Sequence, residues 1–143
     1  MLHEQTILRK VQRFSVHGII LDKGKLLLIT EKRGPYAGKL NFPGGGIEFG
    51  EAPEETLRRE LQEEVGVSFE KCNLLDNLAN TIEVMKPSDP FIFHHVDMIY
   101  NVEGYRFIED AQPEEKFSWY TLKELHVETL APFAKIMIER LRK

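Results

Sequence analysis

A run of glycines that leads into a sharply bounded helix constrains this chain more than any other feature of its sequence. Residues 43–46 read Pro-Gly-Gly-Gly, and an apolar pattern with helical spacing follows them. Pro53 suits the first turn of a helix, and Gly66 suits the position just after its last turn. The apolar positions recur every four residues and form one stripe, made of Leu57, Leu61 and Val65. The sequence therefore predicts a flexible loop followed by a helix that packs one face against a core.

Three glutamates, Glu60, Glu63 and Glu64, share one face of that predicted helix. At about 100° per residue, Glu64 lies about 40° from Glu60 on one side and Glu63 about 60° on the other. Like charges three or four residues apart destabilise a helix by about 0.2–0.5 kcal/mol per pair. A hard divalent cation, which prefers oxygen ligands, would remove this repulsion. A solvated acidic face with Arg or Lys partners is the alternative interpretation of the same pattern.

The rest of the chain is dominated by patterns that are typical of strands. Residues 14–21 and 25–30 are apolar runs joined by Asp22-Lys23-Gly24, which predicts a hairpin with a three-residue connection. Further strands are predicted at residues 73–84, 91–102, 105–108 and 117–120, a short helix at 122–125 and a longer one at 132–141. Because the helices do not alternate regularly with the strands, we expect an α/β fold of the α+β type. A mixed sheet flanked by helices would then form a single domain over residues 1–143.

Composition and charge exclude several classes of partner. A length of 143 residues with 42% hydrophobic residues fits one globular domain. The net charge of −4 gives no general attraction for nucleic acid or anionic membranes. The longest apolar run, residues 26–29, is far shorter than the ~20 residues that span a bilayer. With Cys72 as the single cysteine, we expect a cytoplasmic protein, monomeric or homodimeric, that binds neither membranes nor nucleic-acid polymers.

The segment from Gly45 to Val67 has the pattern G-x5-E-x7-R-E-U-x-E-E-x-G-U, in which U is aliphatic. Every defined position of the Nudix box is present, so the chain resembles the Nudix hydrolases. The surroundings agree, with Phe42-Pro43 entering the box and Trp119 near the end of the chain. One departure is Leu40, where many relatives carry a tryptophan. The resemblance implies an α/β/α sandwich with a mixed central sheet flanked by helices.

In Nudix hydrolases the box forms a loop–helix–loop that binds Mg²⁺ or Mn²⁺ against a diphosphate. The resemblance implies that the metal ligands are the carbonyl of Gly44 and the carboxylates of Glu60, Glu63 and Glu64. It gives a supporting role to Glu51 and Arg59, which would tie the loop to the helix. We expect the substrate to contact Gly45, Gly46 and Arg33, with a solvent-exposed Arg33 as the alternative.

The general base is left open between two places in the sequence. Glu60 or Glu63 could serve while also binding metal. Relatives often use a glutamate on a later loop, and Glu114 or Glu115 matches that place. A solvated loop charge is the alternative interpretation of each of these two.

The resemblance implies metal-dependent hydrolysis of a diphosphate linkage in a nucleoside diphosphate derivative or a nucleoside triphosphate. The expected partner is therefore a small nucleotide or a nucleoside diphosphate conjugate. Residues 81–85 lack the proline and the tyrosine that mark relatives acting on ADP-ribose or dinucleoside polyphosphates, which favours a nucleoside triphosphate or a small conjugate. The alternative is a catalytically silent Nudix-fold module that binds a nucleotide and regulates something else.

Two adjacent histidines, His94 and His95, lie within the predicted strand at 91–102. Alternation sends their side chains to opposite faces of the sheet, so at most one of them can face a pocket. A partly buried structural histidine is the preferred interpretation of each.

Overall fold

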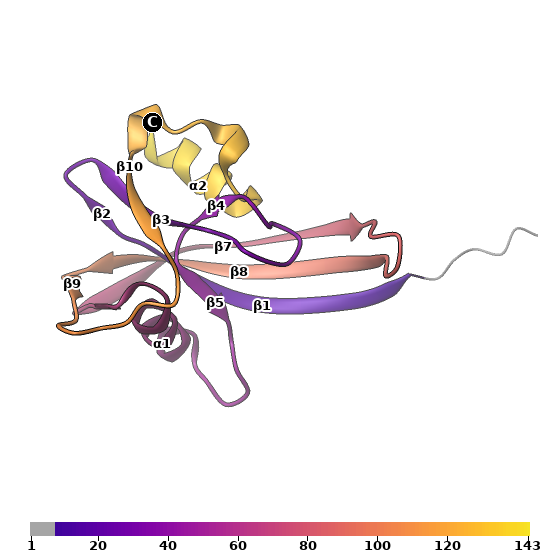
Figure 1. Cartoon of the computed structure of the whole chain (residues 1–143), viewed down its shortest axis with the longest axis horizontal. Coiled ribbons are helices and arrows are strands. Elements are labelled where there is room, and N and C mark those ends of the chain that lie inside the picture. Colours follow the sequence, from indigo (N-terminus) through magenta and orange to yellow (C-terminus); the bar gives the residue numbers. More distant parts are fainter. Residues whose placement is uncertain (1–7) are drawn as a thin grey trace, which may run out of the picture.

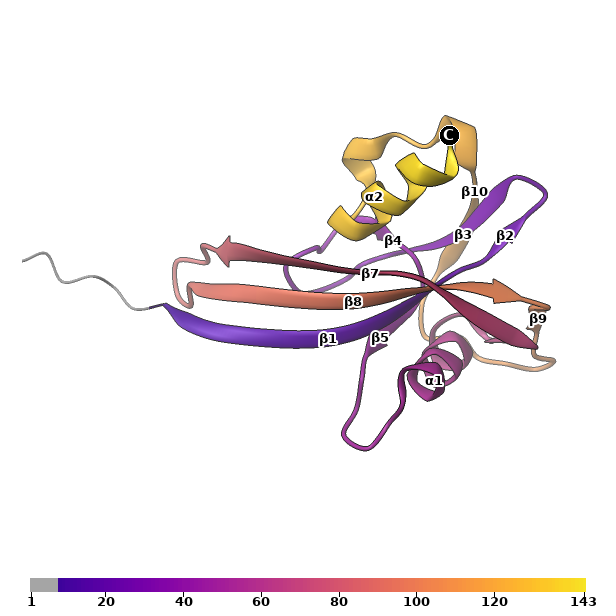
Figure 2. The same ribbon diagram turned by 180° about the vertical axis from the view of Figure 1, so that it is seen from behind.

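The computed structural model describes residues 8–143, in which two helices lie on opposite sides of a long sheet (Figures 1 and 2). The helices are α1 (Pro53–Val65) and α2 (Pro132–Leu141), with 3-10 turns at Leu122–Glu124 and Val127–Thr129. The strands are β1 (Arg9–Ile19), β2 (Leu21–Asp22), β3 (Lys25–Thr30), β4 (Leu40–Asn41), β5 (Gly44–Gly46), β6 (Val67–Ser68), β7 (Lys71–Val84), β8 (Phe91–Glu103), β9 (Arg106–Phe107) and β10 (Phe117–Thr121). The layers confirm the predicted α/β/α sandwich.

The central sheet is mixed, as predicted from the sequence. It has the order β5-β1-β8-β7, in which β1 and β8 run parallel and the other neighbours run antiparallel. A second sheet has the order β10-β3-β2, with β4 also paired to β3, and β6 pairs with β9. Among the described residues, no helix is long and apolar enough to cross a membrane.

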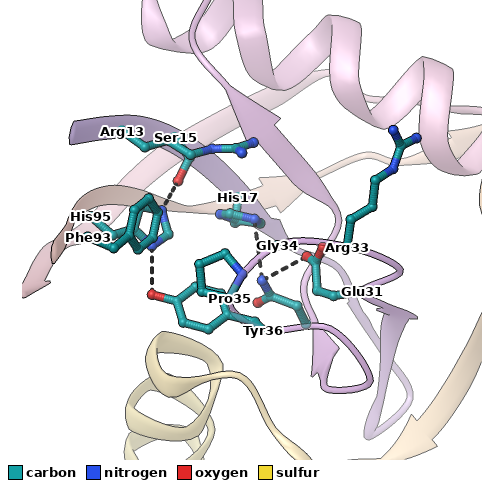
Figure 3. Close-up of a pocket in the computed structure, with 11 residues that line it drawn as sticks. Arg13, Ser15, His17, Glu31, Arg33, Gly34, Pro35, Tyr36, Phe93 and His95 are labelled. Carbon is teal, nitrogen blue, oxygen red and sulfur yellow. Dashed lines mark hydrogen bonds between the residues drawn. The ribbon is translucent and has the colours of Figure 1, made fainter. Parts of the chain in front are cut away.

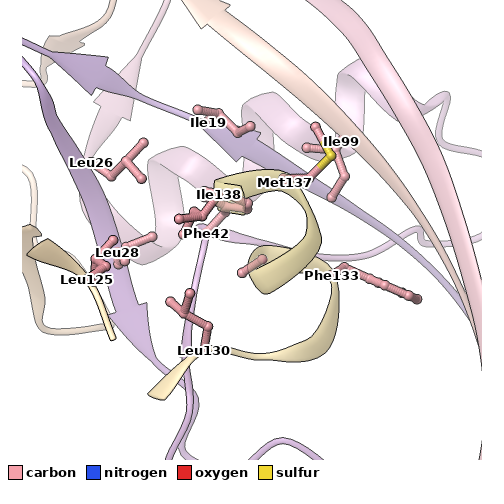
Figure 4. Close-up of a cluster of buried hydrophobic side chains, with 11 residues drawn as sticks. Ile19, Leu26, Leu28, Phe42, Ile99, Leu125, Leu130, Phe133, Met137 and Ile138 are labelled. Carbon is pink, nitrogen blue, oxygen red and sulfur yellow. The ribbon is translucent and has the colours of Figure 1, made fainter. Parts of the chain in front are cut away.

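The helix α1 forms where the sequence predicts it. Its proline occupies the first turn, and Gly66 ends the helix with φ 67°, a left-handed conformation that glycine adopts without steric cost. The apolar stripe is fully buried in one of two core clusters, on the side of β1 and β3 that faces α1. The second cluster lies under α2 and is built around Phe42, Ile99 and Ile138 (Figure 4).

The hairpin is also present, but its boundaries differ from the prediction. Asp22 belongs to β2, so the connection is the two-residue turn Lys23-Gly24, with φ 52° and φ 78°. The first strand begins at Arg9 and not at Phe14, because β8 pairs with it from Phe91 onward. Hydrogen bonding to a distant strand, and not an apolar pattern, defines this extension.

The glycine run departs most from expectation, because Gly44–Gly46 is not a free loop but the strand β5, paired antiparallel with β1. The reason is the close approach of two backbones. A Cβ added to Gly44 would lie 2.0 Å from the carbonyl oxygen of Val16, so only glycine fits there. Smaller corrections concern residues 105–108, where the strand is only Arg106–Phe107, and residues 122–125, where the turn is a 3-10 helix.

Candidate functional site

The glycine strand and the acidic face of α1 enclose a cavity of about 560 Å³, which we call the acidic cavity. The predicted site residues that line it are Arg33, Gly44, Gly45, Arg59, Glu60, Glu63, Glu64, Glu114 and Glu115. Gly46, which lies in β5 opposite Ser15, is not among its lining residues within the described chain. Glu51 does not line it either, but binds Arg59. The acidic cavity therefore brings together most of the residues singled out from the sequence.

Arg59 joins the loop before α1 to the acidic face of the helix. Its Nε and Nη2 donate to the two oxygens of Glu51 at 2.7 and 2.9 Å, a bidentate contact. Its Nη1 donates to Glu60 at 2.8 Å and to Glu63 at 3.2 Å. The hydrogen bond from Arg59 is the main cause that lowers the pKa of Glu51 to about 2. One guanidinium thus holds three carboxylates, two of which belong to the predicted metal ligands.

Two carboxylates in the acidic cavity are poorly compensated. Burial is the main cause that raises the pKa of Glu64 to about 8. A 2.7 Å hydrogen bond from the backbone N–H of Gly44 lowers the pKa but does not outweigh burial. Burial also raises the pKa of Glu60, although Arg59 opposes the shift. A buried carboxylate favours its neutral form unless a positive charge lies nearby. The two side chains therefore favour the binding of a cation.

The donor set fits a hard divalent cation such as Mg²⁺ or Mn²⁺, which prefers carboxylate and carbonyl oxygen. Gly45 leaves space beside one donor, since a Cβ there would lie only 2.5 Å from the carboxylate carbon of Glu60. Within residues 8–143, no three Asp, Glu, His or Cys side chains already converge on a single ion position. Instead, Arg59 holds Glu60 and Glu63. Metal binding would replace these contacts with metal–oxygen contacts.

The later loop is fixed to the end of α1 by its backbone. The N–H groups of Glu114 and Glu115 donate to the carbonyls of Glu63 and Glu64 at 2.9 and 3.0 Å. The side chain of Glu115 is 19% exposed and lies 3.3 Å from the ammonium group of Lys32. Both glutamates are therefore placed at the acidic cavity by contacts that the sequence pattern did not reveal.

A second, smaller cavity of about 60 Å³ lies next to the first and is more apolar, and we call it the inner cavity (Figure 3). It is lined by Arg13, Ser15 and His17 of β1, Phe93 and His95 of β8, and Tyr36 and Asn41 from the segment that follows β3. Most of these residues are not among those predicted from the sequence. The available signal was the spacing by two of the polar residues in β1, which places them on one face of the strand.

A buried carboxylate organises the polar side chains behind the inner cavity. Asp97 of β8 is 2% exposed and accepts hydrogen bonds from His17 Nδ1 at 2.8 Å and from Ser15 Oγ at 3.0 Å. Burial lowers the pKa of His17, but the charge of Asp97 and its hydrogen bond outweigh burial, so that the pKa is raised. The hydrogen bond to Asp97 fixes the position of His17, which lines both cavities.

The two adjacent histidines of β8 face opposite sides of the sheet, as predicted. His94 bonds to Gln12 on the outer face, whereas His95 is 4% exposed and faces the inner cavity. Burial is the main cause that lowers the pKa of His95 to about 4, although Asp97 opposes the shift. His95 is therefore neutral near neutral pH. It packs on Phe93 and Phe133, at ring-centroid distances of 5.4 and 5.0 Å.

Comparison with known proteins agrees with this geometry. A family model described as NUDIX domain matches residues 11–141. The chain is 34% identical over 128 residues to an 8-oxo-dGTP diphosphatase of Escherichia coli (strain K12), covering 88% of this chain and 93% of that protein. It is 42% identical over 65 residues to an 8-oxo-dGTP diphosphatase of Proteus vulgaris, covering 44% of this chain and 58% of that protein. The crystal structure of a MutT NUDIX hydrolase from Burkholderia pseudomallei superimposes with a TM-score of 0.70 at 25% identity, covering 92% of this chain and 98% of that one.

Proposed function

Because the chain belongs to the NUDIX family and is a pyrophosphohydrolase, we propose that it hydrolyses an 8-oxopurine nucleoside triphosphate, 8-oxo-dGTP in particular. Water would attack a phosphorus of the triphosphate and release the nucleoside monophosphate and pyrophosphate. The observation that carries the proposal is the contact between the two cavities, which share Arg13, His17, Glu31, Arg33 and Gly34. A triphosphate fits the acidic cavity, and the polar groups that line the inner cavity would match the polar edges of a base once Tyr36 moves out. Two relatives that bear the name 8-oxo-dGTP diphosphatase support the same substrate.

The phosphate end of the substrate needs a positive charge next to the acidic face of α1. We expect Glu60, Glu63 and Glu64 to hold Mg²⁺ or Mn²⁺, with the carbonyl of Gly44 as a further ligand. When bound, such an ion neutralises phosphate oxygens and lowers the pKa of bound water. Carboxylates suit these hard cations better than imidazole or thiolate does. The acidic cluster and an anionic substrate are compatible only with this ion between them.

The chain's own cations and carboxylates complete the phosphate site. Lys32 and Arg33 line the acidic cavity and offer donors to phosphate oxygens. Arg59 and Glu51 keep the loop on the helix through their 2.7 Å contact. Glu115 lines the same cavity and, with Glu114 as the alternative, would accept the proton of the attacking water.

A substrate panel tests this proposal. We expect that, with Mg²⁺ or Mn²⁺, 8-oxo-dGTP gives the highest kcat/KM and exceeds dGTP at least tenfold. The product should be pyrophosphate and not inorganic phosphate, and hydrolysis should stop with EDTA. A matched variant, Glu64→Gln, should lose most of this activity because it removes the charge of one buried donor. A higher kcat/KM on ADP-ribose or another nucleoside diphosphate conjugate would contradict the proposed substrate.

A further inference from the structure

A buried chain of hydrogen bonds runs from Asp97 to the loop that carries Tyr36, and Figure 3 shows its part from Ser15 through His95 to Tyr36. Ser15 Oγ donates to Asp97 at 3.0 Å, Ser15 Oγ lies 2.5 Å from His95 Nε2, and Tyr36 Oη lies 3.1 Å from His95 Nδ1. Asp97, Ser15 and His95 are 2%, 2% and 4% exposed. Because these three side chains are almost fully buried, each proton in the chain has a defined place.

The direction of each hydrogen bond follows from the number of protons available. The hydroxyl of Ser15 has one proton and gives it to Asp97, so its oxygen can only accept from His95. Nε2 of His95 must therefore carry the proton of a neutral imidazole, and Nδ1 is left as a bare acceptor. Tyr36 satisfies that acceptor with its hydroxyl proton. The carboxylate of Asp97 thus fixes the tautomer of His95 through Ser15.

We propose that His95 determines which base the inner cavity accepts, by offering a hydrogen-bond acceptor where an 8-oxopurine carries its N7–H. This inference rests on the proposed function, and it adds the residue that distinguishes an oxidised from an ordinary purine. In an 8-oxopurine N7 bears a proton and donates, whereas in guanine N7 has a lone pair and accepts. The lone pair of guanine N7 would then face the lone pair of His95 Nδ1, and neither acceptor would have a donor. Sites built for a substrate N–H discriminate strongly against an analogue that lacks it.

Tyr36 occupies this acceptor in the absence of a base. At about 60 Å³ the inner cavity holds a few water molecules and is too small for a purine. Tyr36 must therefore move out when a base enters, and its loop carries glycines with positive φ on both sides, Gly34 at 79° and Gly38 at 86°. The N7–H of the ligand replaces the hydroxyl proton of Tyr36 on Nδ1, so the buried acceptor stays satisfied.

The first test removes the acceptor and keeps an aromatic ring. In His95→Phe, kcat/KM for 8-oxo-dGTP should fall at least tenfold while kcat/KM for dGTP changes much less, so that the preference shrinks. The matched control is His94→Phe, the neighbouring histidine on the outer face, which should keep the ratio of the wild type. An unchanged ratio in an active, folded His95→Phe would overturn the inference.

The second test acts on Ser15, a positioning residue that sets the tautomer of His95. In Ser15→Ala either nitrogen of His95 can carry the proton, so the ratio of kcat/KM for 8-oxo-dGTP over dGTP should fall at least threefold, partly through a gain on dGTP. Imidazole ¹⁵N chemical shifts give a separate readout: protonated Nε2 in the wild type, and a mixture in Ser15→Ala. Protonated Nδ1 in the wild type would overturn the inference even if His95→Phe failed to fold.

The outcomes separate this inference from the proposed function. Absence of pyrophosphate release from both nucleotides by the wild type with Mg²⁺ or Mn²⁺ would refute the proposed function. Hydrolysis of both nucleotides with ratios that stay within twofold in His95→Phe and Ser15→Ala would leave that function intact. It would refute the role of His95.

Discussion

Gly45 is the position at which a single methyl group tests the acidic cavity without disturbing the fold. Its φ does not lie in the left-handed region, so alanine is compatible with the backbone there. An added Cβ would lie 2.5 Å from the carboxylate carbon of Glu60 and 2.6 and 2.7 Å from its two oxygens. Ordinary contacts between such atoms are about 3.5–4.0 Å, so the carboxylate must move by about 1 Å. The end of a flexible side chain can make that movement, which a backbone atom could not.

The expected result for Gly45→Ala is a folded protein with little activity. Displacing the carboxylate weakens the 2.8 Å contact between Glu60 and Arg59, and such a partly exposed pair contributes about 0.2–1 kcal/mol. A misplacement of about 1 Å in a reacting site, in contrast, can cost about a hundredfold in rate. We therefore expect the free energy of unfolding, from urea titration, to change by less than about 1 kcal/mol. We expect kcat/KM for 8-oxo-dGTP to fall about a hundredfold.

Neighbouring glycines and a double variant control this experiment. Gly46→Ala should lose much less activity, since its Cβ would meet Arg13 at 3.4 Å and not reach Glu60. Gly44→Ala should unfold, because its Cβ would lie 2.0 Å from the backbone carbonyl oxygen of Val16. In a Glu60→Ala background, Gly45→Ala should cost little further activity, as expected for two changes that act on one group. Additive losses, or near-normal activity in a folded Gly45→Ala, would refute this reasoning.

Glu63→Gln should lower kcat at least about a hundredfold, and should leave the thermal midpoint equal or higher, because it relieves repulsion on α1. Mg²⁺ should raise the thermal midpoint of the wild type more than NaCl does at equal ionic strength, and a non-cleaved nucleotide should add to that shift. An equal shift with NaCl would indicate that the acidic face is merely solvated. The free energy of unfolding should fall by on the order of 2 kcal/mol as the pH drops from about 6.5 to about 4. The reason is that His95 takes up a proton at a higher pH in the unfolded chain than in the folded chain. Urea titrations of His95→Phe should lack this part of the pH dependence.

The helix α1 could be predicted because its signals are local. The proline in the first turn, the apolar residues four apart and Gly66 after the last turn are all read within one segment, and the structure has the helix at Pro53–Val65. The same holds for the hairpin, although its turn is Lys23-Gly24 and not the predicted three residues. Where neighbours in sequence are neighbours in space, periodicity and turn chemistry suffice.

The features that the sequence analysis missed depend on pairing between distant segments. Three glycines with no side chains carry no strand signal, and β5 exists because it pairs with β1, where Ser15 lies opposite Gly46 and His17 opposite Gly44. The inner cavity likewise needs the parallel register in which Ser15 lies opposite Asp97 and His17 opposite Ile99. A polar residue in a strand is a weak signal by itself, and only this register shows that Ser15, His17 and Asp97 meet.

The strand β1 connects the two halves of the site and fixes their separation. On one edge it pairs with β5, where His17 lies opposite Gly44, so it positions the start of the acidic cavity. On the other edge it pairs in parallel with β8, where Arg13 lies opposite His95, so it positions the inner cavity. Because side chains alternate along a strand, a slip by one residue would turn Arg13, Ser15 and His17 away from both cavities. In the proposed function, the distance between the phosphate and the base of the substrate is therefore set by backbone pairing across three strands.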